Sequence, residues 1–235
     1  MYSCLPGADE ESLGLSPVLV EFSETGINTW NRLLNKTENQ PALSLIVSME
    51  SLEQLSARLI PWCVIDANGY SVTLAFADTR VLPQLFKVLT PEQIAQLCGP
   101  MLFWQYVQRD ANWAQLPMPC TDQHAADKVM LSEPQCSALT DASEADNVLY
   151  KFKTASPALL QHILPAEAHA SVIYWLACAE HANIESPPDR LSLCEFGIRN
   201  PYLMHRDTIT NWKNKPRQSK TIDNLCQDWL TLAAT

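Results

Sequence analysis

The sequence has few glycines and no long apolar run, and both shortages exclude classes of protein. Only 6 of the 235 residues are glycine, and these are dispersed, so a glycine loop that cradles phosphate is not expected. No segment approaches the roughly 20 apolar residues of a membrane helix. The segment Met1–Gly7 lacks the basic and then apolar pattern of a secretory signal. We therefore expect a cytoplasmic protein without a membrane association.

Catalytic and metal-binding motifs are also lacking. The chain has no Gly-x-Ser-x-Gly, no His-Glu-x-x-His and no Cys-x-x-Cys. Cys178 and His181 share a helix face at a spacing that suits zinc, but His169 would lie about 18 Å from His181 at 1.5 Å per residue. Two ligands do not make a zinc site. We expect no metal, no cofactor and no catalysis. The cysteines are expected to be reduced and structural: Cys4, Cys63, Cys98, Cys120, Cys136, Cys178, Cys194 and Cys226.

The charge is acidic overall and unevenly distributed. A net charge of -10 argues against nucleic acid, because phosphates need a basic face. Residues 1–31 carry five acids and no base, whereas residues 199–220 carry six bases and one acid. The basic segment is either a solvated helix face or a docking surface, for a partner or for the acidic end of the same chain.

The first half of the chain predicts strands alternating with helices. Short β-type runs occupy Pro17–Phe22 and Ala42–Ser48, and a helical apolar spacing over Ile27–Leu34 lies between them. Ser51 and Gln54 form a capping box before a helix that Pro61 ends.

The next stretch predicts a hairpin, two helices and a further strand. Asn68-Gly69, between Trp62–Ile65 and Tyr70–Phe76, predicts a tight two-residue turn. Helices follow from Val81 and from the capping box at Thr90, and a strand is predicted over Met101–Val107.

The second half of the chain has helical periodicity throughout. Helices are expected after Ser132, over 166–183, from Ser186 to Gly197 and from Thr221. Residues 110–127 are polar and proline-bearing, so they predict a linker. The predicted class is α+β. A mixed α/β lobe with a small sheet spans 1–109, the linker spans 110–127, and an all-α lobe spans 128–235.

Asp78 and Arg80 stand where the hairpin ends and the next helix begins. Asp78 suits a helix cap and Arg80 suits an ion pair with a carboxylate. The functional alternative is an acid/base pair in a cleft. A cap and an ion pair explain both residues without chemistry.

Several of these segments together resemble the effector chaperone/adaptor family of bacterial type VI secretion systems. The resemblance rests on Pro17–Glu21, Leu45–Ser48 with its following helix, Phe76–Leu82, and Gly99-Pro100 before an apolar segment. It covers residues 1–107 well and the helical remainder loosely. Thr79 replaces the proline of the family motif, and the strand and helix with which the family usually begins are absent before Tyr2.

The resemblance implies a non-catalytic, cytoplasmic protein that holds a toxin effector and loads it onto the VgrG spike protein, with no cofactor. Two other classes stay open: an immunity protein that blocks a toxin, and a small hydrolase using Asp78 with His124 or His205. Trp212 in the basic segment suits an interface anchor. The candidate partner-binding residues are Asp78, Arg80, Trp104, Arg206, Trp212 and Lys213.

Overall fold

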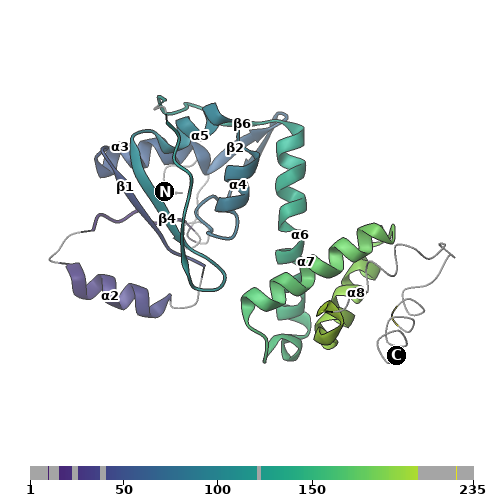
Figure 1. The fold of residues 1–235 in the computed structure, drawn as a ribbon. Coiled ribbons are helices and arrows are strands. Elements are labelled where there is room, and N and C mark those ends of the chain that lie inside the picture. Colours follow the sequence, from purple (N-terminus) through teal and green to yellow (C-terminus); the bar gives the residue numbers. More distant parts are fainter. Residues whose placement is uncertain are drawn as a thin grey trace. The chain divides into compact units, whose positions relative to one another are not determined.

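The chain forms two compact units, residues 1–142 and 143–235. The structure is a computed structural model that describes residues 10, 16–22, 26–37, 41–120, 123–205 and 226. Within these ranges the strands all lie in the first unit and the second unit is helical (Figure 1). This arrangement confirms the predicted α+β class.

The first sheet joins three antiparallel strands in the order β1-β4-β5. β1 spans Ser44–Ser48, β4 spans Met101–Val107 and β5 spans Trp113–Gln115. Ile46 pairs with Trp104, and Tyr106 pairs with Ala114. These four side chains contribute to one apolar cluster, so this face of the sheet forms one side of the core.

The second sheet has the order β3-β2-β6 and contains the predicted hairpin. β2 spans Val64–Ala67 and β3 spans Tyr70–Thr73. Asn68 and Gly69 both have positive φ, 56° and 86°, as the tight turn requires. The short strand β6, Met130–Leu131, pairs parallel to β2.

Three helices supply the rest of this core: α3 (Leu52–Leu59), α4 (Leu82–Val88) and α5 (Pro91–Cys98). Both predicted capping boxes form, at Ser51 with Gln54 and at Thr90 with Gln93. The short 3₁₀ turn η3 (Ile60–Trp62) follows α3 at Pro61. The largest fully buried side chains of the first unit are Leu59, Trp62, Leu82, Leu85, Leu97 and Trp104.

Two predictions for the first unit are wrong. Residues 17–22 form no strand, because no described strand pairs with them; Leu19 packs on the core while Val18 and Val20 are exposed. The predicted linker 110–127 is part of the first unit, since β5 pairs with β4 and Leu116 is buried in the core. The boundary between the units falls at residue 142, inside a helix.

The predicted helix over Ile27–Leu34 is confirmed as α2, which spans Ile27–Lys36. It lies at the periphery of the first unit (Figure 1), and none of its residues is buried.

The second unit is built from the second part of the 23-residue helix α6 (Glu133–Ala155), which supplies Ala145, Val148 and Phe152 to its core, and from the helices that follow. They are α7 (Pro165–His181) and α8 (Pro187–Arg199), with the 3₁₀ segments η4 (Pro157–Leu160) and η5 (Pro201–His205). Among the described residues, no helix combines the length and the apolar character that a membrane span needs.

Gly197 does not end α8 as predicted, since the helix continues to Arg199. A β-carbon at Gly197 would lie 1.9 Å from Nε1 of Trp175, so the glycine makes room for the central tryptophan of the second core. The predicted helix from Thr221 lies outside the described residues except for Cys226, which is helical and packs against this core.

Candidate protein-interaction surface

Asp78 and Arg80 bind each other in an exposed turn between β3 and α4. The Arg80 guanidinium donates to both Asp78 carboxylate oxygens, with Nε to Oδ1 at 2.9 Å and Nε to Oδ2 at 3.1 Å. The Arg80 backbone N–H donates to the same Oδ1 at 2.9 Å. The ion pair predicted for Arg80 is therefore confirmed, and its partner is Asp78.

The helix cap predicted for Asp78 is wrong in its details. The side chain satisfies the turn amide of Arg80, while α4 begins after Val81 without a side-chain cap. The Asp78 carbonyl oxygen accepts hydrogen bonds from the N–H groups of Val81 and Leu82, each at 2.9 Å. Asp78 thus organises the turn that starts the helix through its backbone as well as its carboxylate.

Thr79, between these two residues, is buried, and its hydroxyl has no hydrogen-bond partner among the residues that the structure describes. A buried hydroxyl without a partner is less favourable than an apolar group of the same shape.

Asp78→Ala should lower the free energy of unfolding by about 0.5–2 kcal/mol, the range for removing a side chain that accepts a hydrogen bond from a backbone N–H at the start of a helix. The turn amide of Arg80 loses its acceptor and the guanidinium loses its partner. Urea unfolding measures this loss. Binding of a partner per folded molecule should be unchanged, and a variant that is fully stable but does not bind would identify Asp78 as a contact residue.

The other predicted partner-binding residues divide into one buried residue and three that lie outside the described ranges. Trp104 is 1% exposed and packs edge-on against Phe86, with ring centroids 6.0 Å apart. The prediction for Trp104 is therefore corrected: its side chain belongs to the core, and a partner could reach it only if the core opened. Arg206, Trp212 and Lys213 are not described.

Sequence reasoning missed a buried ion pair between Arg58 and Glu50. Arg58 is 5% exposed, and its Nε donates to both Glu50 carboxylate oxygens at 3.0 and 2.9 Å. Its Nη1 donates to the carbonyl oxygens of Gln96 and Gln123, both at 2.9 Å. One guanidinium thus joins the end of β1, the end of α5 and the segment before β6.

Gly99 makes this arrangement possible. A β-carbon at Gly99 would lie 2.2 Å from the Arg58 guanidinium carbon, and the residue has a φ of +52°, which favours glycine. The signal in the sequence was an arginine next to the apolar stripe of α3, but its partners are up to 65 residues away, so no local pattern identifies them.

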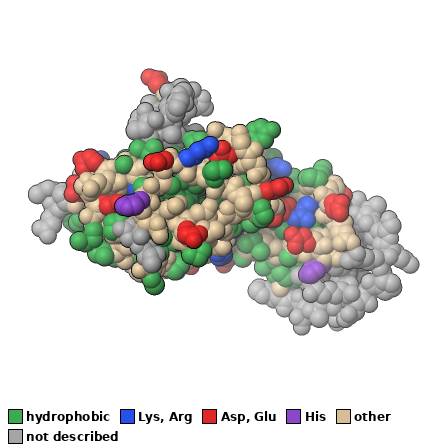
Figure 2. Space-filling model, turned by 90° about the horizontal axis from the view of Figure 1, so that it is seen from above, with side chains coloured by type: hydrophobic (Ala, Val, Ile, Leu, Met, Phe, Trp, Pro, Cys, Tyr) green, Lys and Arg blue, Asp and Glu red, His purple; other side chains and the backbone are tan. Residues whose placement is uncertain are grey.

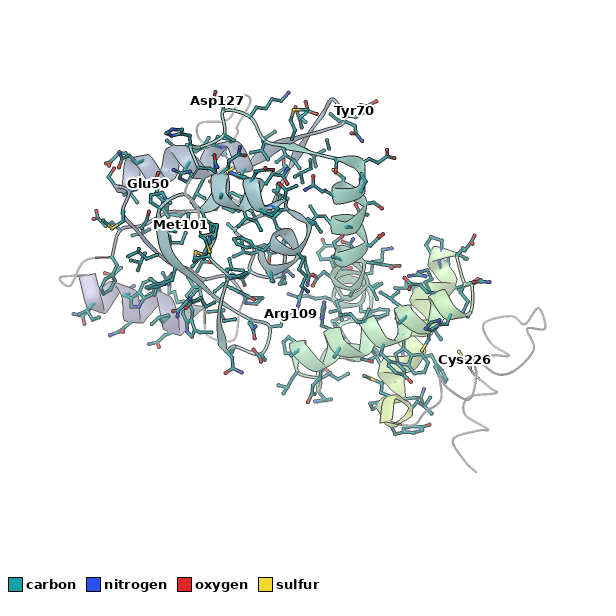
Figure 3. All side chains as sticks on the ribbon, turned by 45° about the horizontal axis from the view of Figure 1, so that its top comes forward. Glu50, Tyr70, Met101, Arg109, Asp127 and Cys226 are labelled. Carbon is teal, nitrogen blue, oxygen red and sulfur yellow. The ribbon has the colours of Figure 1, made fainter. Side chains whose placement is uncertain are left out.

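Exposed apolar side chains gather at one end of each sheet. Met49 and Leu102 flank the same end of the first sheet, where the Met49 N–H donates to the Pro100 carbonyl oxygen at 3.2 Å. Tyr70 and Met130 are exposed at the end of the second sheet. Figure 3 labels Tyr70 at the tip of the hairpin and Glu50 beside the first sheet. Hydrophobic and charged side chains are scattered among other groups over the face that Figure 2 shows.

These four apolar side chains are each at least 60% exposed. Single exposed apolar side chains are normal on a protein surface, whereas large contiguous apolar patches are typical of interaction sites. We call Met49, Leu102, Tyr70 and Met130 the sheet-end residues.

The zinc alternative at Cys178 and His181 finds no support in the geometry. Cys178 is buried while His181 is exposed. Burial raises the pKa of the Cys178 thiol to about 12. No group of three potential ligands occurs among the described residues.

The first unit is a small mixed α/β domain. The family model of a domain of unknown function (DUF4123) matches residues 6–96. These residues include α2, β1, the hairpin, α4 and most of α5. No curated protein and no solved structure matches the chain.

Proposed function

We propose that this chain is a non-catalytic cytoplasmic adaptor that binds a type VI secretion toxin and helps load it onto the VgrG spike. The observation that carries the proposal is the matched segment, residues 6–96. It falls within the part of the chain, 1–107, on which the resemblance to the adaptor family rests.

The described contacts favour a binding role over chemistry for the residues that the motif singles out. The Asp78 carboxylate accepts hydrogen bonds from the Arg80 guanidinium in a turn. This pairing favours a structural role for Asp78 over the role of a general base beside a histidine. The sheet-end residues supply exposed apolar area for a partner, and apolar side chains are what an interface core buries.

The direct test is co-expression of the chain with a spike protein and a toxin encoded beside it. Size-exclusion chromatography with light scattering should detect a complex of all three, and the toxin should keep its activity after release. A complex in which the toxin is inhibited and no spike binds would identify an immunity protein. If neither complex forms and the chain turns over an ester or peptide substrate, the result would identify a hydrolase.

The basic segment 199–220 is proposed to contact the partner. Reversing both Arg206 and Lys213 to Glu should slow association and weaken its dependence on salt, because charges at an interface rim act mainly on the on-rate. Surface plasmon resonance at two salt concentrations measures both effects.

The matched control reverses Lys151 and Lys153, two exposed bases of α6, which changes the net charge by the same amount. If only the 206/213 pair changes the on-rate, the effect belongs to this segment and not to the total charge. A lower melting temperature with unchanged kinetics would mean that these bases pair within the chain.

A further inference from the structure

The turn between β2 and β3 carries the one Asn-Gly pair of the sequence, Asn68-Gly69. Both residues are exposed, and both have positive φ. Asparagine followed by glycine is prone to deamidation, because a residue without a side chain leaves its backbone nitrogen open to the asparagine side chain before it. This turn is therefore the place in the chain where a spontaneous covalent change is most expected.

The reaction has two steps and needs only water. In the first step the Gly69 backbone nitrogen attacks the side-chain carbonyl carbon (Cγ) of Asn68. A new N–C bond forms, the C–N bond of the side-chain amide breaks, and the amide group leaves as ammonia with the proton that the Gly69 nitrogen loses. In the second step water opens the resulting succinimide ring at one of its two carbonyl carbons, which gives aspartate or isoaspartate.

The structure points the attacking nitrogen away from its target. In the succinimide, Cγ of Asn68 takes the place of the hydrogen on the planar Gly69 nitrogen, so the N–H bond has to point toward Cγ before the ring can close. In the folded chain this N–H donates instead to Oδ1 of Asp66, with the nitrogen 2.6 Å from the oxygen. Ring closure therefore requires this hydrogen bond to break first.

Asp66 is itself held by a residue far away in the sequence. Lys128 Nζ donates to the other carboxylate oxygen, Oδ2, at 2.6 Å, and Asp66 pairs with Met130 of β6. The hydrogen bonds from Lys128 and from the Gly69 N–H lower the pKa of Asp66, so the carboxylate is ionised near neutral pH. A charged acceptor binds an N–H more strongly than a neutral one, and its negative charge disfavours removal of the Gly69 proton.

We propose that Asn68-Gly69 is a deamidation site and that Asp66, held by Lys128, restrains the reaction by keeping the Gly69 N–H away from the Asn68 side chain. Asp66 is thus a positioning residue for the turn. The hairpin is modified slowly while the contact holds and faster when the contact is lost. This inference concerns the chain alone and is independent of the adaptor function.

Either product changes the hairpin. Aspartate at position 68 places a second carboxylate two residues from Asp66. Isoaspartate adds a methylene group to the backbone of a two-residue turn, whose geometry sets the register in which Ala67 pairs with Tyr70. Figure 3 labels Tyr70, the first residue of β3. Modification of the turn is therefore expected to weaken the pairing of β3 with β2.

The experiment incubates the full chain in neutral buffer and maps aspartate and isoaspartate at position 68 by peptide mass spectrometry. The folded wild type should react about tenfold more slowly than the chain in urea, and Asp66→Ala should remove most of this difference, because a hydrogen bond to a charged group gives a factor of this order. Asn183 is the internal comparison. It is exposed with a φ of 53°, but Ile184 follows it, so it should stay intact.

Three further variants separate position from stability. Val72→Ala is the matched control, because it shortens an exposed side chain of β3 that pairs with Ile65 and leaves Asp66 in place. Asp66→Asn keeps a carbonyl oxygen that can accept from the Gly69 N–H, so it should retain more of the restraint than Asp66→Ala. Lys128→Met should accelerate the reaction by a smaller factor, since it frees the Asp66 carboxylate without removing it.

The outcomes decide both parts of the proposal. If Asp66→Ala reacts no faster than the wild type, or no faster than Val72→Ala at equal free energy of unfolding, the restraint is overturned. Equal rates in Asp66→Asn and Asp66→Ala would overturn the role of the hydrogen bond. If Asp66→Ala does not fold, a Lys128→Met rate equal to that of the wild type overturns the restraint. If Asn68 stays intact even in urea, it is not a deamidation site.

Discussion

Arg58→Met should lower the free energy of unfolding of the first unit by about 3–5 kcal/mol, the cost of breaking a buried ion pair. The substitution leaves the Glu50 carboxylate, with 15% of its side chain exposed, without its partner. It also removes the hydrogen bonds to the Gln96 and Gln123 carbonyl oxygens. Urea unfolding measures the total, and hydrogen exchange of α3 and α5 assigns it to the first unit.

The matched control is Arg199→Met, which removes an exposed i,i+4 pair with Glu195 in α8. Such pairs contribute about 0.3–0.5 kcal/mol. The double variant Arg58→Met with Glu50→Leu should recover part of the loss, because it removes the orphaned charge as well. If Arg58→Met and Arg199→Met cost the same, the Arg58 pair would not hold the first unit together.

Gly197→Ala should destabilise the second unit by about 1–3 kcal/mol, the usual cost of overpacking. The sign of this change is informative. Helix propensity alone favours alanine over glycine by about 1 kcal/mol, so it predicts a more stable variant. The new methyl group would meet the Trp175 indole, whose Nε1 and Cδ1 lie 1.9 and 2.0 Å from the β-carbon position. Thermal unfolding followed by near-ultraviolet circular dichroism reports both the stability and the packing of Trp175.

Ser192→Ala, at an exposed position in the same helix, is the control and should be neutral or slightly stabilising. Trp175→Phe should then reduce the loss of stability caused by Gly197→Ala, because phenylalanine lacks the five-membered, nitrogen-containing ring of the indole that the new methyl group would meet. A stabilised Gly197→Ala variant would show that the glycine acts through helix propensity alone.

The elements that were predicted well are those whose cause is local. The hairpin depends on two residues that adopt positive φ, Asn68 and Gly69, and a capping box depends on residues three apart. Such interactions are complete within a few residues, so a sequence displays them.

The failures have non-local causes. Pro17–Phe22 has the composition of a strand, but a strand also needs a neighbour to pair with. Residues 110–127 have the composition of a linker, but β4 offers β5 an edge and the core buries Leu116. Gly197 has the residue type of a helix end, and only the position of Trp175 shows why glycine is needed there.

In the candidate site too, local interactions could be predicted from the sequence and non-local ones could not. The pairing of Asp78 with Arg80 spans two residues and was anticipated in kind. Arg58 bonds to residues 8, 38 and 65 positions away, and its role could not be derived from spacing. Trp104 was a candidate partner-binding residue, whereas in the structure it pairs with Ile46 and belongs to the core.

The parallel pairing of β6 with β2 has a consequence for synthesis on the ribosome. Asp66 lies opposite Met130, and Lys128 donates to the Asp66 carboxylate at 2.6 Å, so the second sheet closes only after residue 131 has left the exit tunnel. The segment matched by the family model ends at residue 96, before β4, β5 and β6 exist. A nascent chain of that length carries two hairpin strands and β1 without their remaining partners. The shortest piece that can complete this domain during translation therefore extends well beyond the matched segment, and pairings so distant in sequence form slowly.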